Sequence, residues 1–304
     1  MTHSTDGLVI VDKPGGMTSH DVVARIRRLA GTRRVGHAGT LDPMATGVLV
    51  IGVEKATRLL GYLTLTEKQY DATIRLGQST STDDAEGEIT FTASAKDVSA
   101  TLLSQHKLAT AVTGLTGEIA QVPPAVSAIK VDGQRAYRLT RAGAAPELKP
   151  RPVTVYEFRI TDIRPGGEGL LDVDATVRCS SGTYIRALAR DLGAALETGG
   201  HLTRLRRTRV GGYRIEDART LEQLAGRFEV LPLAQAAAAA FPSRTLTEDE
   251  ARRLAHGGRL AASTASTGAA QAGPATAAAY APDGTLIALV AEEAGQARPL
   301  VVFA

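Results

Sequence analysis

The chain has 304 residues and a hydrophobic content of 43%, enough for one large folded domain and a smaller one. Its single cysteine, Cys179, excludes an intramolecular disulfide and a zinc site built on several thiolates. The formal net charge is only +3, but seven Arg and two acidic residues fall within 186–214, and six basic and two acidic residues within 130–151.

The apolar runs are far shorter than the roughly 20 residues that cross a bilayer. The first residues lack the basic and apolar regions of a signal peptide. We therefore expect a cytoplasmic protein with no membrane partner. The histidines have no paired spacing and no GxxxxGK[ST] loop occurs, so we expect neither a metal site nor nucleotide hydrolysis.

The N-terminal segment predicts a strand followed by a helix. Residues 7–11 form a short apolar run that ends in the turn residues of 13–16. Thr18 is a suitable helix cap with Asp21 at the third position, and Gly31 is a suitable stop. The apolar residues between them recur at helical spacing, so a helix is expected there.

Residues 36–47, GHAGTLDPMATG, form the chemically densest segment. An isolated Asp-Pro pair such as Asp42-Pro43 is more often a turn than a catalytic group. Here it stands among glycines, threonines and a histidine, so Asp42 is a candidate site residue. A buried strand is expected over 47–53, and alternation over 69–76 predicts a second strand whose inner face carries Tyr70.

A third strand is predicted by the alternation over 171–177, and a helix follows it. Thr183 is a plausible cap for this helix, and its buried stripe begins at Ile185. Arg186 stands in the first turn, off that stripe. A cation at a helix N-terminus opposes the helix dipole, so we expect a carboxylate to hold Arg186 in place.

The C-terminal part changes in composition. The alanine-rich residues 234–240 mark either the end of the main domain or the end of a helix. Thr247 and Glu250 form a capping box for a later helix that stops at 257–258. A loop is expected over 261–276. A small β-structure is expected from strands over 277–280, 285–290 and 299–303.

Several of these segments together resemble the bacterial TruB-type tRNA pseudouridine-55 synthases. The resemblance runs in order through most of the first 215 residues, and its motifs are long and independent. The matching segments are VDKPGGMTSHDVV (Val11–Val23), GHAGTLDPMATG (Gly36–Gly47), EKQYDATIRLG (Glu67–Gly77), VPPAVSAIKVDGQRAYRLTRAG (Val122–Gly143), CSSGTYIRALARDLG (Cys179–Gly193) and LRRTRVG (Leu205–Gly211).

The resemblance implies an α+β fold with a mixed or largely antiparallel sheet. It places a pseudouridine synthase catalytic domain at residues 1–240 and a small β-rich, PUA-like RNA-binding domain at residues 241–304. Residues 121–152, called the thumb segment below, would grip the T-arm of tRNA. Guide-dependent relatives share the GTLDP core, but the long segment around residues 130–141 resembles the stand-alone form, so no guide RNA is expected.

The resemblance also implies roles for individual residues. Asp42 would be the nucleophile, Tyr70 would pack against the flipped uracil and assist proton transfer, and Arg186 would pair with Asp42. The residues implied in substrate contact or support of the site are Lys13, His37, Tyr184 and Leu205. The candidates for contact with the RNA backbone are Lys130, Arg135, Arg138, Arg141, Arg206 and Arg207, although such basic runs are individually more often solvated faces.

The implied reaction needs no cofactor, because uridine and pseudouridine have the same atoms. We expect a monomer that acts on tRNA. One alternative is a non-catalytic protein that binds or folds tRNA, although a pure binder has no need for a carboxylate facing an RNA backbone. Another is a nucleoside glycosidase, which would release free base. An assay for pseudouridine, free uracil or neither separates the three.

Overall fold

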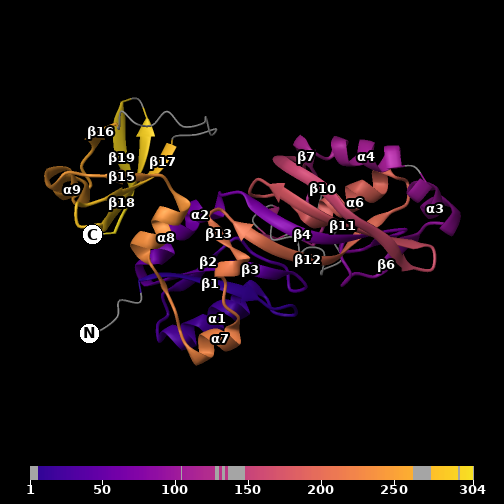
Figure 1. Ribbon diagram of the computed structural model, residues 1–304, viewed down its shortest axis with the longest axis horizontal. Helices are drawn as coiled ribbons and strands as arrows, with labels where there is room; N and C mark the ends of the chain where they lie inside the picture. Colours follow the sequence, from indigo (N-terminus) through magenta and orange to yellow (C-terminus); the bar gives the residue numbers. More distant parts are fainter. Residues whose placement is uncertain are drawn as a thin grey trace.

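The computed structural model describes residues 6–103, 105–126, 130–131, 134–135, 148–262, 275–293 and 295–303. Most of them belong to one large mixed sheet with helices packed along it (Figure 1). Within the described residues this sheet has ten strands, in the order β14-β1-β3-β12-β4-β11-β10-β7, with β2 beside β3 and β13 beside β12. Its strands are β1 (Gly7–Lys13), β2 (Val35–Ala38), β3 (Thr46–Val53), β4 (Lys68–Leu76), β7 (Gly117–Gln121), β10 (Arg151–Gly167), β11 (Leu170–Cys179), β12 (Gly200–Val210), β13 (Tyr213–Arg214) and β14 (Leu231–Pro232).

The strand pairs of this sheet are antiparallel except for β3 and β12, which pair in parallel. This confirms the expectation of a mixed, largely antiparallel sheet. The parallel contact joins Thr46 to Arg206 and Gly47 to Arg207. Gly47 has φ +98°, and a Cβ atom there would lie 2.2 Å from the carbonyl oxygen of Arg207, so only glycine fits this crossing.

The predicted strands are present, and their alternation faces the core as expected. In the β4–β11 pair, Tyr70 lies opposite Val177 and Ile74 lies opposite Val173, all of them buried. The intervening residues of β4 form polar pairs on the other face of the sheet, for example between Arg75 and Asp172. This part of the sheet therefore has one apolar and one polar face, as period-two sequences dictate. In contrast, β1 and β3 are buried on both faces, and their Leu8, Ile10, Val48 and Val50 belong to a second apolar cluster.

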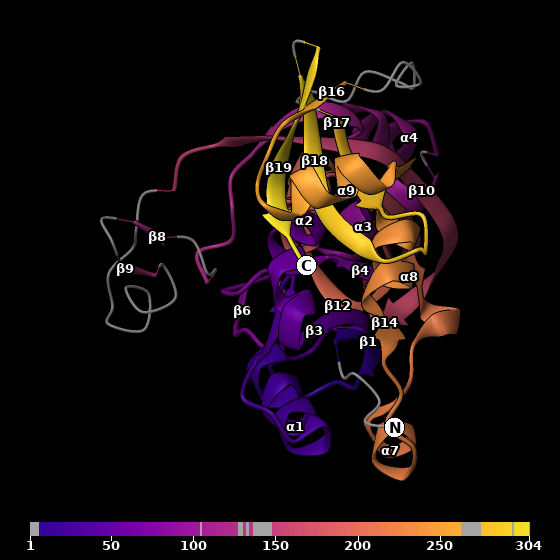
Figure 2. The ribbon, with the colours of Figure 1, turned by 90° about the vertical axis from the view of Figure 1, so that its left-hand side faces the viewer.

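Helices pack against both faces of the sheet, some of them in the main core and others in the second apolar cluster. They are α1 (Ser19–Ala30), α2 (Leu60–Thr64), α3 (Ala95–Leu103), α4 (Gln105–Gly114), α6 (Ile185–Ala195), α7 (Leu221–Gly226) and α8 (Leu233–Ala240), with 3₁₀ turns at Glu54–Leu59 and Ile215–Asp217. Two short strand pairs lie outside the sheet, β5 (Gln78–Thr80) with β6 (Ile89–Thr92) and β8 (Lys130–Val131) with β9 (Gln134–Arg135). Figure 2 shows β8 and β9 away from both larger sheets.

Helix α1 begins and ends where the sequence predicts. The Thr18 hydroxyl accepts a hydrogen bond from the Asp21 amide at 3.1 Å, and the Asp21 carboxylate accepts one from the Thr18 amide at 2.9 Å. Gly31 ends the helix in the left-handed conformation at φ +65°. The buried face, which includes Val22 and Ile26, packs into the main core.

Helix α6 differs from the sequence prediction at its first residue. The cap position belongs to Tyr184, and the Thr183 hydroxyl instead donates to the Ser180 carbonyl oxygen at 3.0 Å. The side chain of Gln121, at the end of β7, accepts from the Tyr184 amide at 2.8 Å. A partner from a distant strand thus satisfies the Tyr184 amide. The predicted apolar stripe from Ile185 onward is buried as expected.

The C-terminal residues form a second sheet, which Figure 2 shows in front of α8. The alanine-rich residues 234–240 lie within α8. Helix α9 begins with the predicted capping box of Thr247 and Glu250. The strands expected around 277–280, 285–290 and 299–303 are present, and most of the loop expected over 261–276 lies outside the described residues. The elements are β15 (Ser243–Thr245), α9 (Glu248–Ala255), β16 (Leu260–Ala261), β17 (Ala275–Tyr280), β18 (Leu286–Glu293) and β19 (Gln296–Val302), with the strand order β15-β17-β18-β19-β16.

The second sheet is attached to the main body through the last residues of the chain. Lys55 and Arg58 donate hydrogen bonds to the carbonyl oxygens of Phe303 and Val302, at 3.0 and 2.6 Å. Tyr280 donates to the Ala234 carbonyl oxygen at 2.9 Å, and an apolar cluster spans both parts. Among the residues placed in the structure, no helix combines the length and apolar character needed to cross a membrane.

Candidate active site

A cavity of about 240 Å³ opens between the loop that precedes β3 and the N-terminus of α6. Its lining includes residues from four of the six segments that carry the resemblance, namely those of the GTLDP loop, β4, α6 and β12. Polar and apolar side chains share the lining, as is usual for sites that hold an organic group. The lining residues are Gly39, Thr40, Leu41, Asp42, Thr64, Lys68, Tyr70, Ser180, Gly182, Thr183, Tyr184, Ile185, Arg186, Leu205 and Arg207.

The loop that carries Asp42 is fixed on both sides of that residue. The Ser19 hydroxyl, at the start of α1, accepts from the Leu41 amide at 2.9 Å and donates to the Leu41 carbonyl oxygen at 3.1 Å. On the other side, the Lys13 ammonium donates to the carbonyl oxygens of Met17 and Pro43, at 2.7 and 3.1 Å. The backbone around Asp42 is therefore held before any ligand binds.

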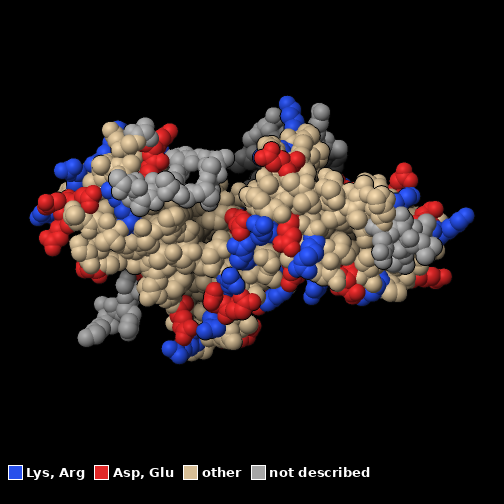
Figure 3. All heavy atoms as spheres, turned by 45° about the horizontal axis from the view of Figure 1, so that its top comes forward, with Lys and Arg blue, Asp and Glu red and all other residues tan. Residues whose placement is uncertain are grey.

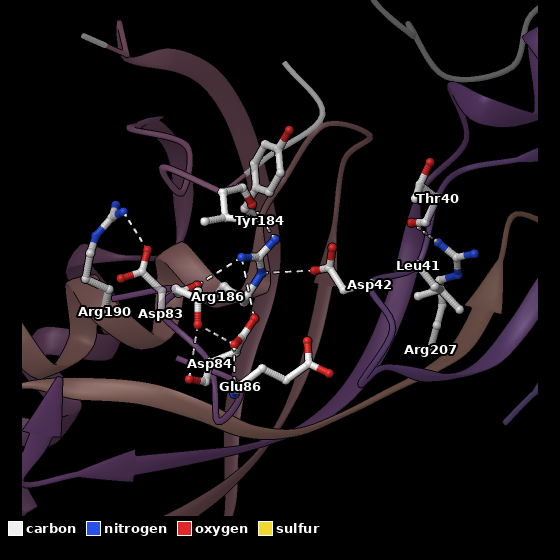
Figure 4. Close-up of polar contacts among 12 residues, drawn as sticks. Thr40, Leu41, Asp42, Asp83, Asp84, Glu86, Tyr184, Arg186, Arg190 and Arg207 are labelled. Carbon is white, nitrogen blue, oxygen red and sulfur yellow. Dashed lines mark hydrogen bonds and ion pairs between the residues drawn. The ribbon is translucent and has the colours of Figure 1, made fainter. Parts of the chain in front are cut away.

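Arg186 holds the Asp42 carboxylate, which gives it the acidic partner that its place in the first turn of α6 predicts (Figure 4). Its Nε atom donates to Asp42 Oδ2 at 2.9 Å. Its side chain is 5% exposed, whereas that of Asp42 is 38% exposed. The guanidinium is thus buried behind the carboxylate, and the carboxylate faces the cavity. Contrary to the expectation that Arg186 lies off the buried stripe, the whole residue is buried.

The remaining donors of Arg186 are also occupied. Nη1 donates to the Thr82 carbonyl oxygen at 2.9 Å and lies 3.5 Å from Asp84 Oδ2. Nη2 donates to the Val126 carbonyl oxygen at 3.0 Å. Because each nitrogen of this planar group has a fixed acceptor, rotation of the guanidinium is restricted. Arg186 therefore presents Nε to Asp42 in one orientation.

Asp84 is a site residue that sequence reasoning missed. Its side chain is 5% exposed, and its Oδ1 atom accepts hydrogen bonds from the Thr82 hydroxyl and the Glu86 amide, at 2.5 and 3.1 Å. In the sequence, TDDAEG reads as an ordinary acidic turn. Only the tertiary fold brings the buried carboxylate of Asp84 to Arg186, so no local signal was available.

Tyr70, Lys68 and Arg207 line the cavity from β4 and β12. Burial raises the pKa of Tyr70, and the nearby positive charge of Arg207 opposes that shift. Burial also lowers the pKa of Lys68 to about 8, and the Lys68 ammonium donates to the carbonyl oxygens of Thr64 and Thr66. Lys68 was not singled out from the sequence, where a lysine at the start of a strand is unremarkable.

The interpretation of Arg207 as a phosphate-binding side chain needs correction. Arg207 is 1% exposed and donates to the carbonyl oxygens of Val48 and Gly39, at 2.7 and 2.9 Å. Arg207 alternates with Arg206 on β12, so it shares the inner face of the strand with Leu205. Its guanidinium fastens β12 to β3 and to the GTLDP loop instead of facing solvent.

Two of the four residues expected to contact or support the substrate line the cavity, namely Tyr184 and Leu205. The other two, Lys13 and His37, are not among the lining residues. His37 is on β2 and makes an edge-on ring contact with His20, with ring centroids 5.4 Å apart. Burial lowers the pKa of His37 to about 4, so it is neutral at pH 7. Burial lowers the pKa of Lys13 to about 8 against the opposing effect of Asp42.

Arg206, another candidate for RNA contact, is not among the residues that line the cavity. Arg206 forms a bidentate ion pair with Asp12, with distances of 3.0 and 2.7 Å. Lys130 and Arg135 are paired residues of β8 and β9, while Arg138 and Arg141 lie outside the described residues. Basic and acidic side chains are interleaved across the middle of the face in Figure 3. In the described ranges, no group of three or more His, Cys, Asp or Glu side chains is arranged to hold a metal.

Comparisons with known proteins agree over the whole chain. The profile described as "TruB family pseudouridylate synthase (N terminal domain)" matches residues 27–185, and "tRNA Pseudouridine synthase II, C terminal" matches residues 241–304. A third profile, "tRNA pseudouridylate synthase B C-terminal domain", matches residues 186–232.

Curated relatives and solved structures point in the same direction. A protein of Thermobifida fusca named "tRNA pseudouridine synthase B" is 61% identical, with 98% of this chain and 99% of that protein covered. A protein of the same name from Arthrobacter sp. is 60% identical, with coverages of 98% and 96%. A chain from the "Crystal Structure of a Cbf5-Nop10-Gar1 Complex" is 27% identical with a TM-score of 0.71, and 99% of this chain and 85% of that chain are covered. The chain therefore belongs to the TruB family of pseudouridylate synthases.

Proposed function

We propose that this protein converts a uridine of tRNA to pseudouridine, that the uridine is U55 in the T-loop, and that Asp42 is the nucleophile. The observation that carries the proposal is the Asp42 carboxylate, which faces a cavity while a buried Arg186 holds one of its oxygens at 2.9 Å. The names of the relatives, "tRNA pseudouridine synthase B", support the same reaction and substrate class.

The reaction can be written with the groups of this chain alone. The C1′–N1 bond of uridine breaks, the uracil turns, a C1′–C5 bond forms, the proton on C5 is lost and N1 gains a proton. Asp42 would form a covalent adduct at either C1′ or C6, which keeps sugar and base together during the turn. Arg186 balances the charge of Asp42 in the free protein. No external oxidant, reductant or group donor is required by this balance.

The target base must leave its stack to reach Asp42, at a cost of a few kcal/mol. We propose that Tyr70, Tyr184 and Leu205 replace the lost stacking, because all three line the cavity beside Asp42. Tyr70 would also assist removal of the proton from C5. Lys13 and His37 do not line the cavity, and we assign them to support of the loop and of β2.

The remaining parts of the chain are assigned to RNA binding. The thumb segment and the unit 241–304 would hold the tRNA around the catalytic domain of residues 1–240. Phosphate contacts are proposed for Arg206, once it leaves Asp12, and for four residues of the thumb segment. These four are Lys130, Arg135, Arg138 and Arg141. We further propose that the protein acts in the cytoplasm as a monomer and without a guide RNA.

The test is to incubate the purified protein alone with an unmodified T-arm RNA and to analyse the nucleosides. Pseudouridine at position 55 is expected, in an amount that approaches one per RNA. An RNA with cytidine at that position is the control and should remain unchanged. Release of free uracil would indicate a glycosidase, and binding without conversion would indicate a non-catalytic RNA-binding protein. Either result would overturn the proposal.

A further inference from the structure

Helix α6 holds residues 121–126, the first part of the thumb segment, at three points. The Gln121 side chain pairs with the backbone of Tyr184, accepting from its amide at 2.8 Å and donating to its carbonyl oxygen at 3.1 Å. Arg190 donates to the Val122 carbonyl oxygen at 2.8 Å. Arg186 donates to the Val126 carbonyl oxygen at 3.0 Å. The guanidinium that holds Asp42 is therefore also bonded to this segment.

Arg190 lies one helical turn after Arg186, so the two side chains leave α6 on the same face. Each also holds the turn that contains residues 82–84. Arg190 contacts Asp83 Oδ2 at 3.1 Å, while Arg186 contacts the Thr82 carbonyl oxygen and the Asp84 carboxylate (Figure 4). Arg190 thus contacts the same two segments as Arg186. Arg186 also contacts Asp42, which lines the cavity, whereas no partner of Arg190 is a lining residue.

The turn of residues 82–84, which Arg190 holds, contains a residue with a strained backbone conformation. Asp83 has φ +61°, a left-handed conformation that costs energy for a residue with a Cβ atom. Its side chain is only 15% exposed, and burial raises its pKa while Arg190 opposes that shift. The ion pair with Arg190 is therefore one of the interactions that keep this turn in place. Asp84 follows directly and presents its carboxylate to Arg186.

We propose that Arg190 is a positioning residue for the reaction: by holding Val122 and Asp83, it places the Val126 carbonyl and the Asp84 carboxylate against Arg186, which in turn orients Asp42. This inference rests on the proposed function. Its physical basis is that a planar guanidinium keeps one orientation only while its acceptors are fixed. Arg190 has no contact with Asp42 and acts only through Arg186.

The proposal predicts an effect on the chemical step and little effect on RNA affinity. The positive charge of Arg190 already faces the carboxylates of Asp83 and Asp191, at 3.1 and 2.9 Å, so it contributes little attraction for phosphates. Arg190→Ala should lower the single-turnover rate at saturating enzyme on the order of 10-fold, since small displacements of a catalytic group cost rate factors up to about 100. The dissociation constant for tRNA should stay within about 2-fold.

The experiment compares Arg190→Ala and five further variants with the wild type. Arg190→Lys keeps one charged donor and should recover part of the rate, and Asp83→Asn should slow the same step. Arg75→Ala is the matched control, because Arg75 is 29% exposed against 28% for Arg190 and also pairs with a carboxylate, but lies on the polar face of the sheet. The double variant of Arg186→Lys with Arg190→Ala should be no slower than Arg186→Lys alone, because Arg190 acts through Arg186.

Each outcome is decisive. A wild-type rate in Arg190→Ala, additive rate losses in the double variant, or a loss of tRNA affinity with an unchanged rate would overturn the role of Arg190. If Arg190→Ala does not fold, Arg190→Lys and Asp83→Asn carry the test, and wild-type rates in both would overturn the role. A wild-type protein that forms no pseudouridine would instead overturn the proposed function itself.

Discussion

Asp42 combines a half-exposed carboxylate with a buried guanidinium partner, which is an arrangement suited to chemistry on a ligand and not to structural stability. We expect Asp42→Asn to abolish conversion of uridine while tRNA affinity stays within a few-fold, because an amide keeps the shape but cannot form the adduct. Single-turnover assays with excess enzyme measure both quantities. Asp174→Asn, which changes an ion pair with Arg164, is the control and should retain the wild-type rate. Residual conversion near the wild-type rate in Asp42→Asn would remove Asp42 from the nucleophile role.

Tyr70 offers two separable properties, an aromatic ring in the cavity and a hydroxyl group near Arg207. Tyr70→Phe should retain tRNA binding but slow the chemical step, because the ring remains and the hydroxyl that would assist proton transfer is lost. Tyr70→Leu should weaken binding as well, because a base no longer stacks there. Rapid-quench kinetics and filter binding measure these effects. Equal rates near the wild type in both variants would show that Tyr70 is a core residue only.

The lowered pKa of His37 predicts that the stability of the folded protein depends on pH. Its folded pKa of about 4 is below the usual value of 6.5, so the unfolded chain binds the proton more readily. The contribution of neutral His37 to the free energy of unfolding is fully present above pH 6.5 and decreases as the pH falls toward 4. Replacing His37 by Gln should therefore reduce the loss of melting temperature between pH 6.5 and 4. If the melting temperatures of wild type and variant fall in parallel with pH, His37 does not titrate in this range.

At the scale of the elements, α1 links a local sequence signal to the active site. Its cap residue Thr18 directly precedes Ser19, which is bonded to the Asp42 loop through Leu41. Thr18→Ala should lower the free energy of unfolding by about 1 kcal/mol, because it leaves an amide at the helix N-terminus without a partner. Urea unfolding followed by circular dichroism measures this. Thr113→Ala, on the exposed surface of α4, should change stability by less than about 0.5 kcal/mol. Equal losses in the two variants would argue against the cap.

Elements whose signals lie within a few residues could be predicted from the sequence. The capping box of Thr18 and the alternation around Tyr70 are of this kind, and both are present in the structure. The cap of α6 was misplaced because its amide is satisfied by Gln121, which is 63 residues away in the chain. Asp84 was missed because its partner Arg186 is 102 residues further on and only the tertiary fold brings them together. The burial of Arg207 could have been predicted, because Arg207 follows Leu205 by two residues on β12 and therefore shares its buried face.

At the scale of the whole molecule, RNA binding should depend on charge distribution, because the net charge of +3 is small and the charges on the face in Figure 3 are mixed. Replacing Arg135, Arg138 and Arg141 together by Glu should raise the apparent KM and reduce the salt dependence of binding. Each lost phosphate contact lowers the log–log slope by a little under one. Conversion at saturating RNA should remain measurable, because Asp42 and Tyr70 are unchanged.

The matched control for that triple variant replaces the same three arginines by Lys. It keeps the charge, so the salt dependence should stay at the wild-type value while the affinity changes little. Affinity measured at several salt concentrations gives both slopes. A Glu variant with wild-type affinity and slope would show that these residues form a solvated face, and the assignment of the thumb segment to RNA binding would fail.

The position of β4 in the sheet has a consequence for synthesis on the ribosome. β4 is complete at Leu76, but its two neighbours, β11 and β12, begin only at Leu170 and Gly200. At translation rates of roughly 5–20 residues per second, β4 waits about 5–20 s for its first partner. During that time both of its edges and its apolar face are unpaired, which is the condition under which strands aggregate. The strand that carries Tyr70 is thus made early and paired late, and we expect a nascent chain of this protein to need shielding of β4 until β11 and β12 emerge.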